Sequence, residues 1–243
     1  GFVAARPVDL DGDGDLDLVA ALAQEHEQVI AFVNQGGLSF EPRLLDGAPH
    51  PCWGTSGLSL VDLDRDGDVD VLVSNGDALD DNLLKPYHGV RWLENRGGLA
   101  FVPHDVGHVH GCEAAAAGDL DGDGDLDVVM TTSGGPARVL RNDASAGRQW
   151  LRVRLVGTSA NRDGVGARVT ATLADGRRLW AEARGGGSYL SQSERVLTFG
   201  LGAERRVATL EVRWPGGRVD TARDVAAGRE VVLREGTGLQ EAR

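Results

Sequence analysis

One nine-residue pattern, Asp-x-Asp-x-Asp-Gly-x-x-Asp, occurs three times in the chain and constrains its fold more than any other feature. The copies begin at Asp9, Asp62 and Asp119, so consecutive copies are 53 and 57 residues apart. Segments that recur at a spacing of about 50 residues are typical of repeat architectures, in which each copy forms one supersecondary unit. The first part of the chain is therefore predicted to contain three such units.

The aspartates of this pattern have the chemistry of a calcium loop. Ca²⁺ takes about six to eight oxygen ligands. Positions 1, 3, 5 and 9 can direct carboxylates inward, position 7 can offer its backbone carbonyl, and the glycine at position 6 permits a sharp turn. We expect one Ca²⁺ in each loop, about three per chain. The predicted metal ligands are Asp9, Asp11, Asp13, Asp15 and Asp17 in the first loop, Asp62, Asp64, Asp66, Asp68 and Asp70 in the second, and Asp119, Asp121, Asp123, Asp125 and Asp127 in the third.

Other interpretations of the pattern are less favourable. An EF-hand requires a glutamate at position 12 and a helix after the loop. Position 12 is Ala20, Val73 or Met130, and strand-like sequence follows. Magnesium retains water and tolerates crowded carboxylates poorly, so calcium is favoured. The motifs could also be simple polar turns formed by Asp and Gly. Such turns would not require the four ligand positions to be intact in all three copies.

Alternating apolar residues flank every loop and predict short strands. In the first unit they cover residues 2–8, 16–23, 28–33 and 38–44. The Asn-x-Gly-Gly segments at Asn34 and Asn95 predict hairpin turns, because glycine readily adopts positive φ. A degraded copy of this segment is marked by Asn142. Four strands in about 50 residues are typical of a β-propeller blade. The second unit carries a polar insertion at about residues 75–88, which we expect to be an exposed loop.

Three blades are too few to close a propeller, which needs about four to eight. We expect the chain to be the C-terminal part of a longer protein that carries the missing blades. The alternative is that subunits associate to complete the ring. Since the chain begins with Gly1, the sequence does not reveal whether a signal peptide was removed.

The second half of the chain differs in charge and pattern. Residues 1–147 contain 8 basic and 26 acidic residues, net −18, whereas residues 148–243 contain 17 and 11, net +6, which together give the chain's −12. Strands are predicted at 150–156, 167–173, 178–183, 195–199, 209–214 and 230–234, with glycine-rich turns between them. The prediction is an all-β protein: a partial β-propeller of three four-stranded blades at residues 1–147, followed by a β-sandwich-like domain at 148–243.

These motifs resemble a known family. The three Asp loops are similar to those of FG-GAP/VCBS repeats, and the segments WLRVRLVGTSANRDGVGARV from Trp150 and LEVRWPGGRVD from Leu210 resemble an ASPIC/UnbV domain. The resemblance implies propeller blades with a calcium loop between their first two strands. It also implies an extracellular or cell-envelope protein with a role in adhesion or matrix, and it is compatible with a bacterial origin. No catalytic residues follow from it.

Two cysteines allow several interpretations. Cys52 and Cys112 precede the second and third loops, and only one disulfide pairing is possible. A disulfide and two free thiols are both compatible with the sequence. A third alternative is a zinc or copper site, because His50 and His110 form repeated His-x-Cys pairs with them.

We found no catalytic motif, so the chain is predicted to be a calcium-binding scaffold or binding protein rather than an enzyme. Its partner would be an unknown protein or a glycan. The alternatives are a metal-dependent enzyme or biosynthetic accessory protein that uses the His/Cys pairs, and a glycan-binding module that uses some of the five tryptophans. A nucleic-acid surface is disfavoured, because the arginines of the second half are mixed with acids. The apolar runs are too short to span a bilayer.

Overall fold

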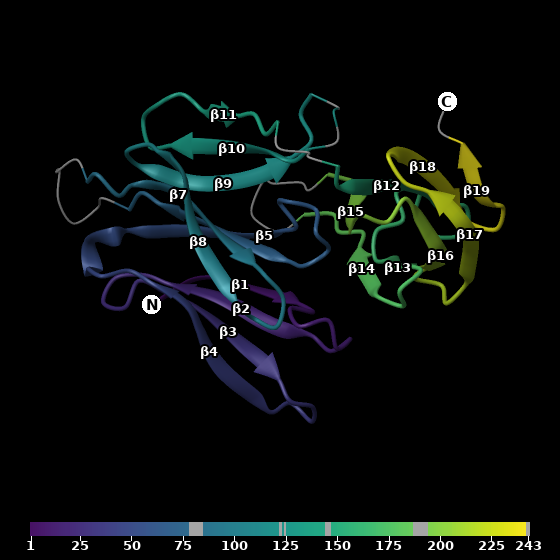
Figure 1. Cartoon of the computed structure of the whole chain (residues 1–243), viewed down its shortest axis with the longest axis horizontal. Coiled ribbons are helices and arrows are strands. Elements are labelled where there is room, and N and C mark those ends of the chain that lie inside the picture. Colours follow the sequence, from purple (N-terminus) through teal and green to yellow (C-terminus); the bar gives the residue numbers. More distant parts are fainter. Residues whose placement is uncertain (78–84, 122, 124, 144–146, 187–193, 242–243) are drawn as a thin grey trace. The chain divides into compact units, whose positions relative to one another are not determined.

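A computed structural model describes residues 1–77, 85–121, 123, 125–143, 147–186 and 194–241. The chain divides into two compact units, one of residues 1–63 and 68–145 and one of residues 64–67 and 146–243. Five sheets make up the described structure, and its one helix is the short 3₁₀ turn η1 (Pro51–Trp53). The prediction of an all-β protein is confirmed (Figure 1).

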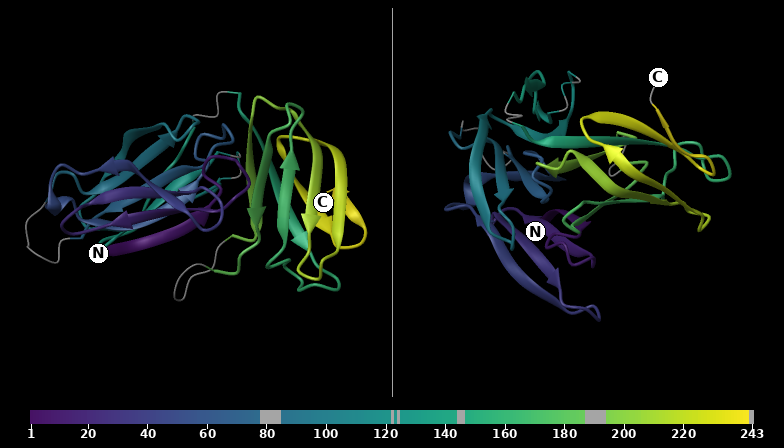
Figure 2. Two further views of the ribbon diagram at one scale, coloured as in Figure 1. Left: turned by 90° about the horizontal axis from the view of Figure 1, so that it is seen from below. Right: turned by 45° about the vertical axis from the view of Figure 1, so that its right-hand side comes forward.

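The first unit contains three antiparallel sheets, one for each repeat (Figures 1 and 2). The strands of the first two sheets lie side by side in chain order, whereas the third sheet has three strands over the described residues, with β10 in the middle. The strands are β1 (Phe2–Val8), β2 (Asp17–Leu22), β3 (Gln28–Asn34) and β4 (Phe40–Gly47); β5 (Thr55–Val61), β6 (Asp70–Asn75), β7 (Gly89–Asn95) and β8 (Phe101–His108); and β9 (Cys112–Gly118), β10 (Asp127–Thr132) and β11 (Arg138–Leu140).

The insertion of the second repeat falls between β6 and β7, where the sequence places it. Residues 78–84 of this insertion, with Asp80, Asp81 and Asn82, lie outside the described residues.

Consecutive sheets pack through opposite faces of their strands. Side chains alternate between the two faces of a strand, so one sheet can contribute to two cores. From the second sheet, Val71 and Val73 pack with residues of the first sheet such as Val19. Leu72, on the other face of β6, packs with Met130 of the third sheet. The second sheet is therefore covered by apolar neighbours on both faces, and all six residues of β6 are buried.

The second unit consists of two four-stranded sheets, in the orders β15-β12-β18-β19 and β14-β13-β16-β17. Both contribute buried side chains to one common core. Their strands are β12 (Gln149–Val156), β13 (Arg168–Thr172), β14 (Arg178–Glu182), β15 (Val196–Gly202), β16 (Arg206–Arg213), β17 (Val219–Ala226), β18 (Arg229–Arg234) and β19 (Gly238–Glu241). Strands β17 and β19 were not predicted from the sequence. The parallel pairing of β12 with β18, which lie far apart in the chain, was not predicted either.

Two buried polar groups connect elements of the second unit. Trp214 is fully buried, and its indole N–H donates to Asp220 Oδ2 at 2.8 Å. Glu235 accepts from the backbone N–H groups of Thr158, Ser159 and Ala160 at 2.7–2.8 Å, and these bonds hold the pKa of its carboxyl below the ordinary value. Both carboxylates therefore have backbone or side-chain donors supplied by the same unit, as buried polar groups usually do.

We predict that residues 148–243 fold when expressed alone, with a melting temperature that a calcium chelator leaves unchanged. The reason is that every residue of the second unit's core cluster lies between Leu151 and Leu233, and none of the Asp loops is in this segment. Thermal unfolding followed by circular dichroism, with and without EDTA, is the measurement. A shift of several degrees on adding EDTA would place the domain boundary elsewhere.

Candidate metal centres

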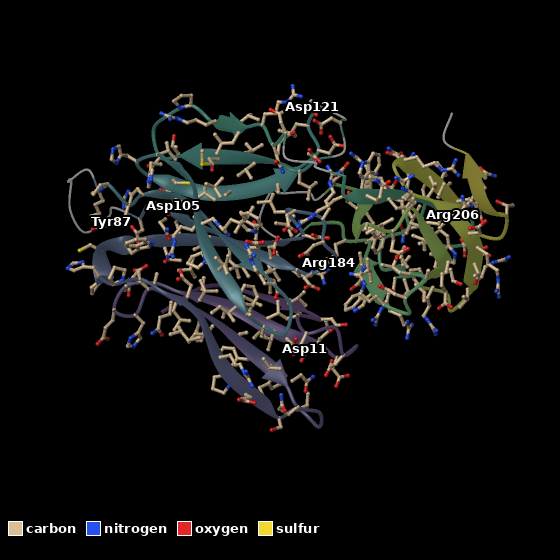
Figure 3. The ribbon with its side chains drawn as sticks, in the orientation of Figure 1. Asp11, Tyr87, Asp105, Asp121, Arg184 and Arg206 are labelled. Atoms are coloured by element: carbon tan, nitrogen blue, oxygen red, sulfur yellow. The ribbon has the colours of Figure 1, made fainter. Side chains whose placement is uncertain are left out.

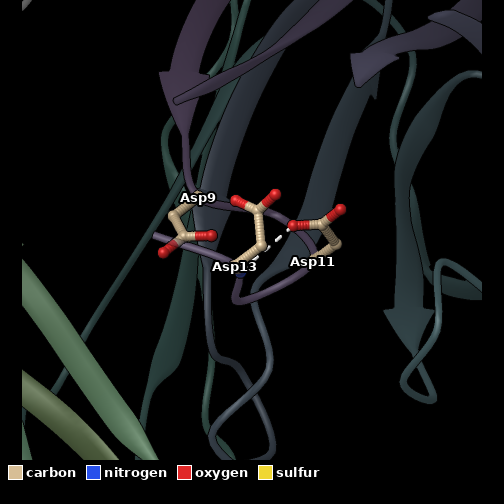
Figure 4. A group of neighbouring side chains, drawn as sticks. All are labelled: Asp9, Asp11 and Asp13. Carbon is tan, nitrogen blue, oxygen red and sulfur yellow. Dashed lines mark hydrogen bonds between the residues drawn. The ribbon is translucent and has the colours of Figure 1, made fainter. Parts of the chain in front are cut away.

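Each Asp loop brings three carboxylates together. Oxygen atoms of the aspartates at positions 1, 3 and 5 lie within 4.8 Å of one another in all three loops. The groups are Asp9, Asp11 and Asp13; Asp62, Asp64 and Asp66; and Asp119, Asp121 and Asp123. Figure 4 shows the first group, and Figure 3 places Asp11 and Asp121 in loops at the ends of the first and third sheets. Three carboxylates at this separation repel one another strongly unless a cation lies among them.

Local hydrogen bonds produce this arrangement. The backbone N–H of Asp13 donates to Asp11 Oδ1 at 3.2 Å, which is the dashed contact in Figure 4, and that of Asp15 donates to Asp13 Oδ1 at 2.8 Å. These are turns of the kind that Asp side chains form with the backbone two residues further on. Gly14 and Gly67, at position 6, have φ of 98° and 101°, a region that other residues adopt only with strain. The equivalent Gly124 lies outside the described residues.

The aspartate at position 9 has a different role from the other three. Asp17 is buried; its Oδ2 accepts from the backbone N–H of Leu10 at 2.8 Å, and its Oδ1 accepts from that of Asn34 at 2.7 Å. The other two loops repeat both bonds at 2.8–3.0 Å, through Asp70 and Asp127. This carboxylate therefore ties the start of the loop to the end of the sheet's third strand.

The asparagine at the end of the third strand completes this connection. The side-chain amide of Asn34 donates to the carbonyl of Leu16 at 3.2 Å, and its Oδ1 accepts from the N–H of Gly36 at 3.0 Å. Asn95 makes the same two contacts in the second sheet. From the sequence, these asparagines were predicted only to mark turns. Their constant position relative to the loops was the available signal that they also hold the loop.

The predicted ligand set is thus brought together in part. Positions 1, 3 and 5 converge, and position 9 lies behind them with both carboxylate oxygens on backbone amides. The carbonyls of Asp15, Asp68 and Asp125, at position 7, stay predicted ligands. Burial raises the pKa of the Asp11 carboxyl, and the nearby charges of Asp17, Asp13 and Asp9 raise it further, while a backbone hydrogen bond from Asp13 opposes the shift.

The third loop contains a positive charge that the first does not. Arg141 lies in the segment after β11, and its Nε is 3.0 Å from Asp121 Oδ2. Its Nη2 is 3.6 Å from Asp123 Oδ2. By position relative to the repeated asparagine, the equivalent residues are Val33 and Glu94. In the third loop a guanidinium therefore neutralises part of the charge that a metal ion would otherwise balance.

The cysteines do not form a site of the kind the sequence allowed. Both are free thiols, so the possible Cys52–Cys112 disulfide is absent from the structure. Cys52 is in η1, where its N–H donates to His50 Nδ1, whereas Cys112 is buried in the core between the second and third sheets. Burial raises the pKa of the Cys112 thiol to about 11, which makes it a poor metal ligand. Among the residues that the structure describes, the groups able to hold a metal are the three Asp groups alone.

Models of protein families match both units of the chain. A model for the FG-GAP-like repeat matches residues 9–73 and 75–130, and one for the FG-GAP repeat matches residues 113–151. A model described as ASPIC and UnbV matches residues 157–240. The chain belongs to the FG-GAP repeat proteins with an ASPIC/UnbV domain. The resemblance stated from the motifs is confirmed.

Curated relatives of this FG-GAP chain carry the name cartilage acidic protein 1. The protein from Homo sapiens is 34% identical over 116 residues, which are 45% of this chain and 17% of the relative. Those from Xenopus tropicalis and Mus musculus are 34% and 33% identical over 119 and 115 residues, covering 46% and 45% of this chain and 18% and 17% of those proteins. The matched part therefore spans less than a fifth of the relatives' length.

We predict different effects of two similar substitutions on the stability of the calcium-free protein. Asp17→Asn places an amide against two backbone donors and should lower the free energy of unfolding by about 2–3 kcal/mol, the cost of an unsatisfied buried group. Asp11→Asn removes a charge from the repelling group and should leave the free energy of unfolding unchanged or raise it. Urea denaturation in the presence of EDTA measures both. Equal destabilisation by the two variants would contradict the division of roles between positions 3 and 9.

Proposed function

We propose that the chain is a calcium-binding scaffold or binding protein that acts outside the cytoplasm, with one Ca²⁺ in each Asp loop and its first three sheets as propeller blades. The observation that carries this proposal is the convergence of carboxylates at positions 1, 3 and 5 in three separate loops. Hard oxygen donors of this kind suit Ca²⁺, whereas zinc or copper sites usually contain histidine or cysteine.

Calcium in these loops would act on stability. It would replace the mutual repulsion of three carboxylates by attraction to a common cation, while position 9 keeps its backbone contacts and adds negative charge behind the site. An ion that binds only the folded protein stabilises it by RT ln(1 + [Ca²⁺]/Kd), about 2.7 kcal/mol when calcium is at 100 times Kd. Three sites together would give about 8 kcal/mol, comparable to the whole stability of a typical domain.

The proposed location follows from the kind of site. Short Asp loops on exposed turns are expected to bind weakly, and calcium outside cells is sufficient for sites with Kd of about 10⁻⁴–10⁻³ M. Over the described residues, no helix has the length and hydrophobicity needed to cross a bilayer. FG-GAP repeats suggest a binding role, and we propose a protein or glycan as the partner.

An enzymatic role for the His/Cys pairs has less support. His50 accepts a hydrogen bond that caps a 3₁₀ turn, and Cys112 belongs to a hydrophobic core. Neither belongs to a group of potential metal ligands among the described residues. The metal content of the purified protein separates the two functions: calcium alone supports the scaffold, whereas stoichiometric zinc, copper or iron supports the enzyme.

The direct test is a calcium titration of EDTA-treated protein by calorimetry and native mass spectrometry. We expect three Ca²⁺ per chain. Asp11→Asn, Asp64→Asn and Asp121→Asn should each weaken one site by about tenfold or more, equivalent to ~1.4 kcal/mol, with additive effects because the loops are on different sheets. Fewer than two bound ions would contradict the proposal.

Arg141 allows a sharper form of this test. Arg141→Ala removes a competing charge from the third loop, so it should tighten one of the three sites and leave the other two unchanged. Arg138→Ala, which removes an exposed arginine of the neighbouring strand β11, is the matched control and should change none of them. If Arg138→Ala tightens calcium binding as much as Arg141→Ala does, the arginines act through long-range charge, and the contacts of Arg141 with Asp121 and Asp123 have no special role.

A further inference from the structure

One face of the sheet β14-β13-β16-β17 is turned away from the core of the second unit (Figure 1). Val169 of β13 and Val212 of β16 belong to that core, and side chains alternate between the two faces of a strand. The intervening residues form the outer face, which we call the arginine face. Its charged residues are Arg168, Arg178, Arg213, Arg223, Glu182 and Glu211. All four arginines are exposed, and they outnumber the two glutamates.

Two arginines of this face lie next to each other on neighbouring strands. Arg168 of β13 is directly opposite Arg213 of β16 in the antiparallel ladder. The β carbons of such a pair are about 4.5–5.5 Å apart, and like charges in this position destabilise a sheet. Glu211 compensates little, because its Oε1 is 3.9 Å from Arg213 Nη2 and both side chains are exposed. An anion between the two guanidinium groups would remove the repulsion.

Arg168 is held in place by an aromatic ring rather than by a carboxylate. Its guanidinium carbon lies 3.8 Å from the centre of the Trp180 ring. Glu182 is opposite Arg168 in the ladder, but it pairs with Arg184 at 3.9 Å, and no carboxylate of the described residues forms an ion pair with Arg168. A guanidinium stacked on a ring keeps its N–H donors in the ring plane, where they can bind an acidic group through two hydrogen bonds.

The other sheet of the second unit treats its arginines differently. Arg152 and Arg154 lie on the outer face of β12, since Leu151, Val153 and Leu155 are in the core. Arg152 pairs with Glu194, and Arg154 Nε is 2.8 Å from Glu230 Oε1. Positive charge that no carboxylate of the unit balances closely is therefore a feature of the arginine face, although acids and arginines are mixed along the sequence.

The spacing of the arginines indicates the kind of anion that fits. Arg178 is opposite Thr172, four residues along β13 from Arg168, and this distance is roughly 13 Å at about 3.4 Å per residue. Arg223 lies at the same end of the face as Arg178. Between the two ends the hydroxyl of Thr170 and the carboxylate of Glu211 lie opposite each other. These groups can bind uncharged hydroxyl groups, and Glu211 repels a ligand that is charged along its whole length.

We propose that the arginine face binds an acidic polysaccharide in which charged and neutral sugars alternate. Carboxylates of the ligand would lie at the two arginine ends, and its hydroxyl groups would lie over the band between them. A nucleic acid fits less well, because it has a phosphate on every nucleotide and would place charge against Glu211. The inference rests on the binding role proposed above and gives that role a partner. It does not depend on calcium, because no residue of the face belongs to an Asp loop.

Calorimetry with the 243-residue protein tests this proposal, in EDTA and again in calcium. The probes are decasaccharides of hyaluronan, which has a carboxylate on every second sugar, and of polygalacturonate, which has one on every sugar. Arg168→Gln/Arg213→Gln removes two charges from the arginine face. Arg154→Gln/Arg234→Gln removes two from the outer face of the other sheet and is the matched control. Trp180→Leu keeps every charge but removes the ring that holds Arg168.

We expect hyaluronan to bind more tightly than polygalacturonate, with the same affinity in EDTA and in calcium. Arg168→Gln/Arg213→Gln should weaken binding by about tenfold or more, and the control pair by less than about twofold. Trp180→Leu should weaken it by about threefold, and circular dichroism checks that each variant is folded.

The absence of hyaluronan binding would overturn the proposal. Equal weakening by the two double variants would also overturn it, because only long-range charge would then be involved. Tighter binding of oligo(dT) or of phosphatidylserine vesicles than of hyaluronan would make a nucleic acid or a membrane the partner instead. Calcium titration of the same variants reports separately on the Asp loops, so a failure of the calcium sites and a failure of the arginine face are distinct results.

Discussion

The repulsion between carboxylates in the Asp loops is the constraint on which the first unit depends. Each loop joins the first two strands of a sheet and holds three carboxylates with oxygens within 4.8 Å. A fourth, buried carboxylate lies behind them in every copy and fastens the loop to the third strand through two backbone amides. Each sheet is therefore joined to its loop by this carboxylate, while positive charge would stabilise the closed form of the exposed part of the loop.

The first and third loops differ in how the charge of their carboxylates is balanced. In the third, Arg141 contributes a guanidinium to two of the three carboxylates. In the first, desolvation and the charges of the neighbouring aspartates raise the pKa of the Asp11 carboxyl. The same repeat thus provides loops of different charge balance, so the calcium sites proposed for them are expected to differ in affinity.

Local patterns in the sequence predicted much of this structure, and contacts between distant residues were the part they could not predict. Strand β1 has the predicted bounds, and β2, β3 and β4 differ by one to three residues at their ends, because alternation and Asn-x-Gly-Gly turns are local signals. The convergence of positions 1, 3 and 5 follows from short-range turns and was also predictable. Three features were not predicted. The hydrogen bond between Asp17 and Asn34 and the parallel pairing of β12 with β18 join residues that are far apart in the sequence. The contact of Arg141 with the third loop has no counterpart in the other two repeats that could have signalled it. Strand β17 was missed because charged residues such as Arg223 and Asp224 interrupt its alternation.

The central claim is that calcium holds the Asp loops in their closed form, and limited proteolysis with mass mapping of the cuts tests it most directly. We predict that EDTA exposes cleavage sites within residues 9–17, 62–70 and 119–127 and that calcium protects them again. Sodium chloride should protect only in part, because salt screens the repulsion without supplying a cation that the carboxylates share. Cleavage within residues 148–243 should not change. If the loops resist protease equally with and without calcium, the carboxylates do not need the ion and the proposed structural role of calcium is wrong.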